Sequence, residues 1–347
     1  MTIAFVVGGT LFGAAVLWLA CSRLEEATHR LAQYYGIPDA VKGSVLLAVS
    51  SSMPELVTAL LAFPVHNDFE LGLSAIIGSA IYNILVIPAF SVYARGRPLK
   101  ANRDLVYREA QFYLVSVAVL MLILSLSVIY GGLETEFMPD GREIYLGEFT
   151  RYLAAFPLML YALYLYIQFE EVKRNRDENP RQEGISPMKE WAILAGCIVL
   201  ILIGVELLLR VAITLGDMLQ TPTFLWGMTI VAAATSIPDT FVSVRASVMG
   251  RTESSVSNVL GSNVFDLLVA VPLGVMITGA IAVNFTQIVP MMTFLVLATI
   301  VMLVFMLRDM ELSLRESHAM MVLYAGFGIW MTLEAFGVST LLGVRGP

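Results

Sequence analysis

Apolar stretches long enough to cross a lipid bilayer recur along this chain, separated by short polar breaks. A transmembrane helix needs about 20 predominantly apolar residues. Ten windows reach or approach this length, at 3–22, 38–63, 70–94, 108–130, 150–170, 189–210, 223–247, 255–279, 286–307 and 317–338. The pattern predicts an all-α polytopic membrane protein with ten transmembrane helices.

The most polar break falls between the fifth and sixth windows and divides the chain into two halves of five helices. We expect a first repeat over 1–170, a linker over 171–188 and a second repeat over 189–347. A linker of this length is too short for a separate regulatory domain. Because five is an odd number, the second repeat would cross the membrane inverted relative to the first, as in many transporters.

Basic residues are distributed unevenly between the two sides of the predicted membrane. Loops after odd-numbered windows hold 17 of the 21 lysine and arginine residues, and the other four are Arg142, Arg151, Arg210 and Arg345. Cytoplasmic loops carry the excess of positive charge. We therefore expect a multi-pass protein of the plasma membrane (the inner membrane of the cell), with both termini outside and the central linker in the cytoplasm.

Composition supports a membrane protein and excludes one class of partner. The chain is 58% hydrophobic and 14% charged, whereas soluble domains carry about 25% charged residues. The net charge of −7 and the lack of a basic stripe argue against nucleic-acid binding. Expected partners are small inorganic cations and the lipid bilayer, and the oligomeric state is left open.

Two motifs occur once in each half. Residues 51–55 (SSMPE) match residues 235–239 (TSIPD), and residues 78–83 (GSAIYN) match residues 261–266 (GSNVFD). The spacing agrees, with 28 residues from Glu55 to Asn83 and 27 from Asp239 to Asp266. Carboxylates inside membrane helices are rare and mark ion pathways. A doubled pattern of them on broken helices indicates a cation transporter built from two repeats.

Pro54 and Pro238 predict breaks in the second and seventh helices near the middle of the membrane, because proline removes a backbone donor and clashes with the preceding turn. Ser52 and Glu55 also match a capping box, as do Ser236 and Asp239. Capping alone would be a purely structural role. A charge at the bilayer centre costs at least ~2.5 kcal/mol, which favours a binding role.

Oxygen donors gather in and beside these motifs. Hard cations take oxygen ligands, and Ca²⁺ takes six to eight at about 2.3–2.6 Å. Without histidine or cysteine nearby, the chemistry favours Ca²⁺, Na⁺ and K⁺ over zinc or copper, and no cofactor is expected. The candidate ligands are the side chains of Glu55, Asp239, Asp266, Asn83, Ser51, Ser52, Ser79, Thr235, Ser236 and Ser262, together with unwound backbone at Ala48 and Ala232.

Other residues are expected to serve packing and structure. Small residues let membrane helices approach closely. Those beside the motifs are Gly43, Ala48, Gly78, Gly227, Ala232 and Gly261. Glu206 and Arg210, four residues apart, predict a local ion pair near the outer surface.

At these motifs the chain resembles the cation/Ca²⁺ exchanger superfamily and, within it, the potassium-dependent sodium/calcium exchangers. The resemblance covers about 40–90, including residues 54–58 (PELVT), and about 225–275, including residues 236–240 (SIPDT). It implies that Glu55 and Asp239 mainly hold Ca²⁺, that Na⁺ competes for overlapping oxygens, and that Asp266 favours K⁺ use. The sequence departs from the Gly-Thr-Ser common in the superfamily, with SSS at residues 50–52 and ATS at residues 234–236.

We therefore expect a secondary antiporter, not an enzyme, that exchanges Na⁺ for Ca²⁺ by alternating access, with K⁺ moving alongside Ca²⁺. A Ca²⁺/H⁺ antiporter is the nearest alternative, because buried carboxylates can bind protons. A cation channel and an intramembrane enzyme that uses the carboxylates as acid and base are further alternatives. Stoichiometry, ion affinities and resting conformation stay open.

Overall fold

The structure is a computed structural model that describes residues 2–36, 46–132, 136–137, 143–175 and 184–339. The predicted start of the second membrane helix, including Gly43, and part of the predicted linker lie outside these residues. The long helices are α1 (Thr2–Tyr35), α5 (Phe69–Arg95), α6 (Arg103–Gly131), α7 (Arg151–Asn175), α8 (Pro187–Leu219), α14 (Phe285–Asp309) and α15 (Leu314–Ala335).

Three further segments consist of shorter helices joined end to end. They are α3 (Leu47–Ser51) with α4 (Met53–Ala62); α9 (Thr223–Trp226), the π-helix η2 (Gly227–Val231), α10 (Ala232–Thr235) and α11 (Ile237–Val248); and α12 (Thr252–Phe265), the π-helix η3 (Asp266–Ala270) and α13 (Val271–Thr278).

The chain is a helical polytopic membrane protein. Within the described ranges, seven helices are long and apolar enough to cross a membrane: α1, α5, α6, α7, α8, α14 and the continuous segment Thr252–Thr278. The number rises to eight if the bent pair Thr223–Thr235 and Ile237–Val248 is one span. Met53–Ala62 is apolar but shorter. The count of ten spans stays a prediction, since length and composition alone do not place α3–α4 and α15 across a bilayer.

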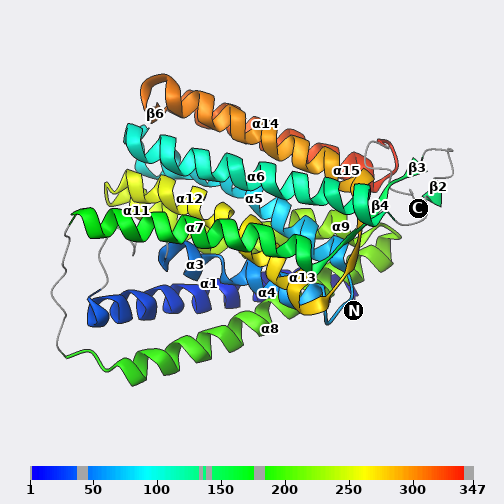
Figure 1. Cartoon of the computed structure of the whole chain (residues 1–347), viewed down its shortest axis with the longest axis horizontal. Coiled ribbons are helices and arrows are strands. Elements are labelled where there is room, and N and C mark those ends of the chain that lie inside the picture. Colours follow the sequence, from blue (N-terminus) through cyan, green and yellow to red (C-terminus); the bar gives the residue numbers. More distant parts are fainter. Residues whose placement is uncertain (1, 37–45, 133–135, 138–142, 176–183, 340–347) are drawn as a thin grey trace.

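Two helices form the buried centre of the bundle. Most residues of α5 and α12 are buried, whereas α1 and α8 expose large apolar side chains such as Leu11 and Ile203. In Figure 1, α1 and α8 form one edge, α14 and α15 the opposite edge, and α5 and α12 lie between them. Because both candidate motif pairs lie on or beside α5 and α12, the centre of the bundle is also where the candidate site lies.

Glycine sets the distance between α5 and the seventh predicted helix. A Cβ added at Gly78 would lie 2.8 Å from the Ala232 Cβ and closer still to the Met228 carbonyl oxygen. From the other side, a Cβ on Gly227 would lie 2.5 Å from the Ser74 Oγ. The two backbones are thus in direct contact, which confirms the packing role predicted for Gly78 and Gly227.

The all-α prediction is incomplete, because three short antiparallel ribbons lie at the helix ends. β1 (Leu99–Lys100) pairs with β6 (Glu311–Leu312), β2 (Glu136–Phe137) with β3 (Glu143–Ile144), and β4 (Leu146–Phe149) with β5 (Ile281–Asn284). The first and third ribbons join the two halves of the chain. Runs of two to four residues carry no readable alternation, and they form because extended connections must pair their backbone groups.

The glycine contact predicts that Gly78→Ala destabilises the protein. The added methyl group would overlap the η2 backbone, and overpacking of this kind costs about 1–3 kcal/mol. We expect the unfolding temperature in detergent to fall by several degrees. Gly196→Ala on α8 is the matched control, because nothing lies within 4 Å of a Cβ there; equal effects of the two substitutions would contradict the close-approach explanation.

Candidate cation-binding site

Two helix breaks place the two motif carboxylates. The first break is at Ser52, between α3 and α4, and the second is at Ser236, between α10 and α11, where the axis bends by 41°. Proline occupies the first turn after each break, followed by Glu55 or Asp239. Both carboxylates are buried, and each lies at the positive end of a helix dipole, which favours negative charge.

Hydrogen bonds bring the four motifs into one cluster. Ser79 Oγ donates to Glu55 Oε1 at 3.0 Å, and Ser262 Oγ donates to Asp239 Oδ1 at 2.9 Å. These two contacts are equivalent in the two halves. Ser79 Oγ also lies 2.8 Å from Ser236 Oγ, and so links the first half to the second.

Asn83 adds a second link between the halves. Its Nδ2 donates to Asp239 Oδ2 at 2.9 Å and to Asn263 Oδ1 at 3.1 Å. Asn263 Nδ2 in turn donates to the Ala80 carbonyl at 3.1 Å. An asparagine chain thus ties α12 to α5 beside the Asp239 carboxylate.

Three buried polar residues of this cluster were not among the predicted ligands: Asn263, Asn258 and Ser243. Asn258 Nδ2 donates to Ser243 Oγ at 3.1 Å, and Asn258 Oδ1 lies 3.5 Å from Ser51 Oγ. Asn263 lies inside the motif at residues 261–266 (GSNVFD) and could have been found there. Asn258 lies four residues before Ser262 and on the same face of α12. Burying its polar side chain in a membrane costs free energy unless its hydrogen bonds are satisfied.

Unpaired acceptors concentrate at this cluster. Among the described residues, six buried side-chain polar atoms have no hydrogen-bond partner, and five of them belong to predicted ligands: Ser52 Oγ, Glu55 Oε2, Asn83 Oδ1 and both carboxylate oxygens of Asp266. Buried polar atoms are normally satisfied, so each exception needs an explanation. All five are oxygens that can coordinate a cation.

Basic side chains do not neutralise these acids. In the part of the chain that the structure describes, no ion pair involves Glu55, Asp239 or Asp266. No three histidine, cysteine, aspartate or glutamate side chains converge closely enough there to hold a metal ion by themselves. Hydroxyl and amide oxygens are therefore needed to complete a coordination shell, which suits hard cations.

The backbone at the breaks is less open than predicted. Ala48 and Ala232 carbonyls accept hydrogen bonds from the backbone nitrogens of Ser52 and Ser236 at 3.0 and 3.1 Å. Each break is confined to one residue, so neither carbonyl lies in an unwound stretch. Thr235 Oγ1 likewise donates to the Ala232 carbonyl, at 3.2 Å.

The capping interpretation of the motif serines is wrong. Neither Ser52 nor Ser236 makes a side-chain cap hydrogen bond. Ser52 Oγ has no partner, and Ser236 Oγ faces Ser79. The hydroxyls point into the cluster rather than at the helix ends.

Ser51 connects the cluster to a cavity of about 250 Å³ between α1 and α11. Its hydroxyl donates to the Leu47 carbonyl at 2.9 Å and lies 3.4 Å from Ser262 Oγ. The cavity is also lined by Pro238, Glu25 and Arg245. It meets the cluster at Ser51, and its other lining residues lie on α1 and on α11.

The predicted pair of Glu206 and Arg210 is confirmed, with Arg210 Nε donating to Glu206 Oε1 at 2.7 Å. His66 Nε2 lies 2.8 Å from the other oxygen of Glu206. This second contact ties the segment after α4 to α8.

Cys21 and Cys197 are free and buried.

Comparison with known proteins gives one consistent match. The profile of the family described as "Sodium/calcium exchanger protein" matches residues 5–170 and 189–333. The chain is 24% identical to sodium/calcium exchanger MaX1 of Methanosarcina acetivorans, over 94% of this chain and 98% of that protein. It is 24% identical to inner membrane protein YrbG of Escherichia coli, over 77% of this chain and 78% of that protein.

A human relative and a solved structure extend the match. Human sodium/potassium/calcium exchanger 5 is 23% identical, over 69% of this chain and 63% of that protein. A structure of the sodium-calcium exchanger NCX_Mj soaked with Na⁺ and Sr²⁺ has a TM-score of 0.61 at 22% identity, over 94% of this chain and 98% of that one. This likeness shows a shared fold.

The unpaired oxygens predict that Ca²⁺ stabilises the purified protein, because a ligand that binds only the folded state raises its unfolding temperature. In Glu55→Gln or Asp239→Asn, the Ca²⁺ concentration for half of this effect should rise by about 100-fold or more, since even outer-shell changes cost 10–100-fold. Thermal unfolding against Ca²⁺ concentration measures it.

Glu109→Gln is the control. Glu109 is equally buried but lies outside the cluster, where Tyr164 and Gln168 already donate to it at 2.9 and 3.0 Å. This variant should keep the Ca²⁺ response. A wild-type protein that Ca²⁺ does not stabilise, or an unchanged response in Glu55→Gln, would contradict the assignment.

Proposed function

We propose that this chain, which belongs to the sodium/calcium exchanger protein family, is a secondary antiporter that exchanges Na⁺ for Ca²⁺ through the cluster around Glu55 and Asp239. The observation that carries the proposal is the set of five buried, unpaired oxygens on predicted ligands. Members of this family are exchangers and not enzymes, and Na⁺ and Ca²⁺ are the ions that the relatives' names give.

The charge of the cluster explains competition between the two ions. One Ca²⁺ balances the two carboxylates of Glu55 and Asp239, and Na⁺ uses the same oxygens. Hydroxyls of Ser52, Ser79 and Ser262 supply neutral ligands. Because ions close together repel strongly where water is scarce, occupancy by Na⁺ excludes Ca²⁺.

The equivalence of the two halves supports a mechanism of alternating access. Ser52 and Ser236 break equivalent helices, and the Ser79–Glu55 contact has its counterpart in Ser262–Asp239. We propose two inverted five-helix repeats, over 1–170 and 189–347, that total ten spans. Inverted repeats allow one site to open to either side in turn.

The orientation rests on the distribution of basic residues. The cavity beside Glu25 and Arg245 would then be a cytoplasmic route to the site. A membrane-impermeant thiol reagent that reaches Ser22→Cys from outside, with both native cysteines replaced, would contradict this orientation.

Asp266 is the proposed K⁺ ligand. It takes the place that Asn83 has in the first half, begins η3, and has two unpaired oxygens. A third carboxylate lets the site carry one more positive charge, so K⁺ can move together with Ca²⁺. Several relatives are named sodium/potassium/calcium exchangers.

Reconstituted vesicles test the exchange. Vesicles loaded with Na⁺ should take up Ca²⁺, and uptake should cease when internal Na⁺ is replaced by an organic cation, because the Na⁺ gradient drives transport. Asp239→Asn should lower the rate at least about 100-fold, while Glu109→Gln retains it. Uptake driven by a proton gradient alone would favour the Ca²⁺/H⁺ antiporter, and unitary currents would indicate a channel.

A second assay isolates the K⁺ component. Wild-type uptake should fall when K⁺ is replaced by an inert cation, whereas Asp266→Asn should transport at a rate that no longer depends on K⁺. The reason is that the substitution removes the charge that K⁺ balances. Equal K⁺ dependence in both proteins would exclude Asp266, and a wild-type protein indifferent to K⁺ would exclude K⁺ transport altogether.

A further inference from the structure

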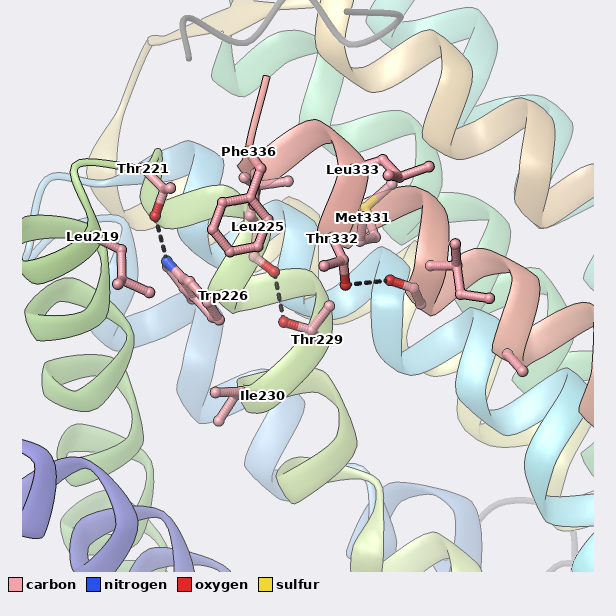
Figure 2. A pocket seen from close by; sticks show the side chains of 14 residues that line it. Leu219, Thr221, Leu225, Trp226, Thr229, Ile230, Met331, Thr332, Leu333 and Phe336 are labelled. Atoms are coloured by element: carbon pink, nitrogen blue, oxygen red, sulfur yellow. Dashed lines mark hydrogen bonds between the residues drawn. The ribbon is translucent and has the colours of Figure 1, made fainter. Parts of the chain in front are cut away.

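A cavity of about 610 Å³ lies between α15, the end of α8 and the α9–η2 segment, and none of the predicted cation ligands lines it (Figure 2). Its volume is in the range of small-molecule binding sites. Leu219 lines it from α8, Trp226 and Ile230 from α9–η2, and Gly328 and Phe336 from α15 and its end. We refer to it as the α15 groove.

The polar groups of the α15 groove are already engaged by the protein. Trp226 Nε1 donates to Thr221 Oγ1 at 2.8 Å, Thr229 Oγ1 to the Leu225 carbonyl at 2.7 Å, and Thr332 Oγ1 to the Gly328 carbonyl at 2.8 Å. Figure 2 shows these bonds along the walls. None of the lining residues is charged. Water would find few partners here, so the walls favour an apolar occupant.

Small residues on α15 create the space. Ala325, Gly328, Thr332 and Ala335 line the groove at helical spacing, and a Cβ on Gly328 would have nothing within 4 Å. The main contact of α15 is with α5 rather than with η2. Thr229 and Ile230 of the π-helix η2 line the groove, beside Leu225 and Trp226 of α9.

In the proposed ten-span arrangement, α15 crosses the membrane and the groove opens onto the surface that faces lipid. Its lining residues Ile329 and Phe336 are 62% and 64% exposed, and α1 and α8 likewise expose large apolar side chains such as Leu11 and Ile203. In a bilayer, the hydrocarbon tails of phospholipids surround such a surface and are the apolar molecules present in greatest excess.

From this opening and the engaged polar groups, we propose that the α15 groove binds an acyl chain of a membrane phospholipid, which lies against Trp226 and η2. The acyl chain would occupy space that no side chain of the described residues fills. It would supply the dispersion contacts that the lining residues lack when the groove is empty. This proposal does not depend on which ions the protein transports.

Fluorescence quenching of Trp226 tests it directly. A variant with Trp18, Trp191 and Trp330 replaced by phenylalanine leaves Trp226 as the only tryptophan. It is reconstituted into phosphatidylcholine vesicles with or without bromine on the acyl chains. Bromine quenches an indole that it contacts, so we expect strong quenching of Trp226 in the brominated vesicles.

Two leucine substitutions in this variant separate groove occupancy from general exposure to lipid. Gly328→Leu projects into the α15 groove and should remove most of the quenching. Gly326→Leu is the matched control, because Gly326 has equally open surroundings but does not line the groove, and quenching should be retained.

Two outcomes would overturn the proposal. In the first, Trp226 is not quenched in the brominated vesicles; crosslinking of Ile329→Cys into a dimer would then show that a second copy of the chain covers the groove. In the second, quenching is the same in Gly328→Leu as in Gly326→Leu.

Discussion

The structure depends on the burial of three carboxylates inside a helical bundle that crosses a membrane. Glu55, Asp239 and Asp266 are at most 1% exposed, and none forms an ion pair within the described residues. A charge at the bilayer centre costs at least ~2.5 kcal/mol on insertion scales. Helix N-termini and serine and asparagine donors offset part of this cost, and a transported cation would offset the rest. The breaks at Ser52 and Ser236, and the glycine contact of α5 with η2, keep those donors within reach.

The two halves of the site are alike in plan and unequal in detail. Ser79–Glu55 and Ser262–Asp239 are equivalent contacts. Asn83 donates a hydrogen bond to Asp239. Its counterpart Asp266 carries no donor group and makes no equivalent bond to Glu55, so that Glu55 Oε2 and both oxygens of Asp266 are unpaired. An amide is both donor and acceptor, while a carboxylate only accepts. One carboxylate is therefore held by the protein, and the other two leave oxygens free for ions.

Much of this arrangement could be predicted from particular residues. Pro54 and Pro238 indicated the breaks, because proline cannot complete a helical hydrogen bond, and the duplicated motifs indicated which segments meet. Asn258 and Ser243 were missed, because their counterparts Ala75 and Ala59 in the first half are apolar and repeat symmetry gives no signal for them. The extent of unwinding at Ala48 and Ala232 was overestimated, since one residue suffices to redirect each helix.

The sequence by itself determined the membrane location, the helical class, the family and the identity of most clustered residues, because hydropathy, proline and motif spacing are local properties of the chain. Only the tertiary structure decided which oxygens remain unpaired, that Asn263 joins Asn83 to the Ala80 backbone, and that α15 leaves a groove beside η2. These depend on the distance and rotation between helices far apart in the chain, which packing at positions such as Gly78 and Gly227 sets and which no linear pattern contains.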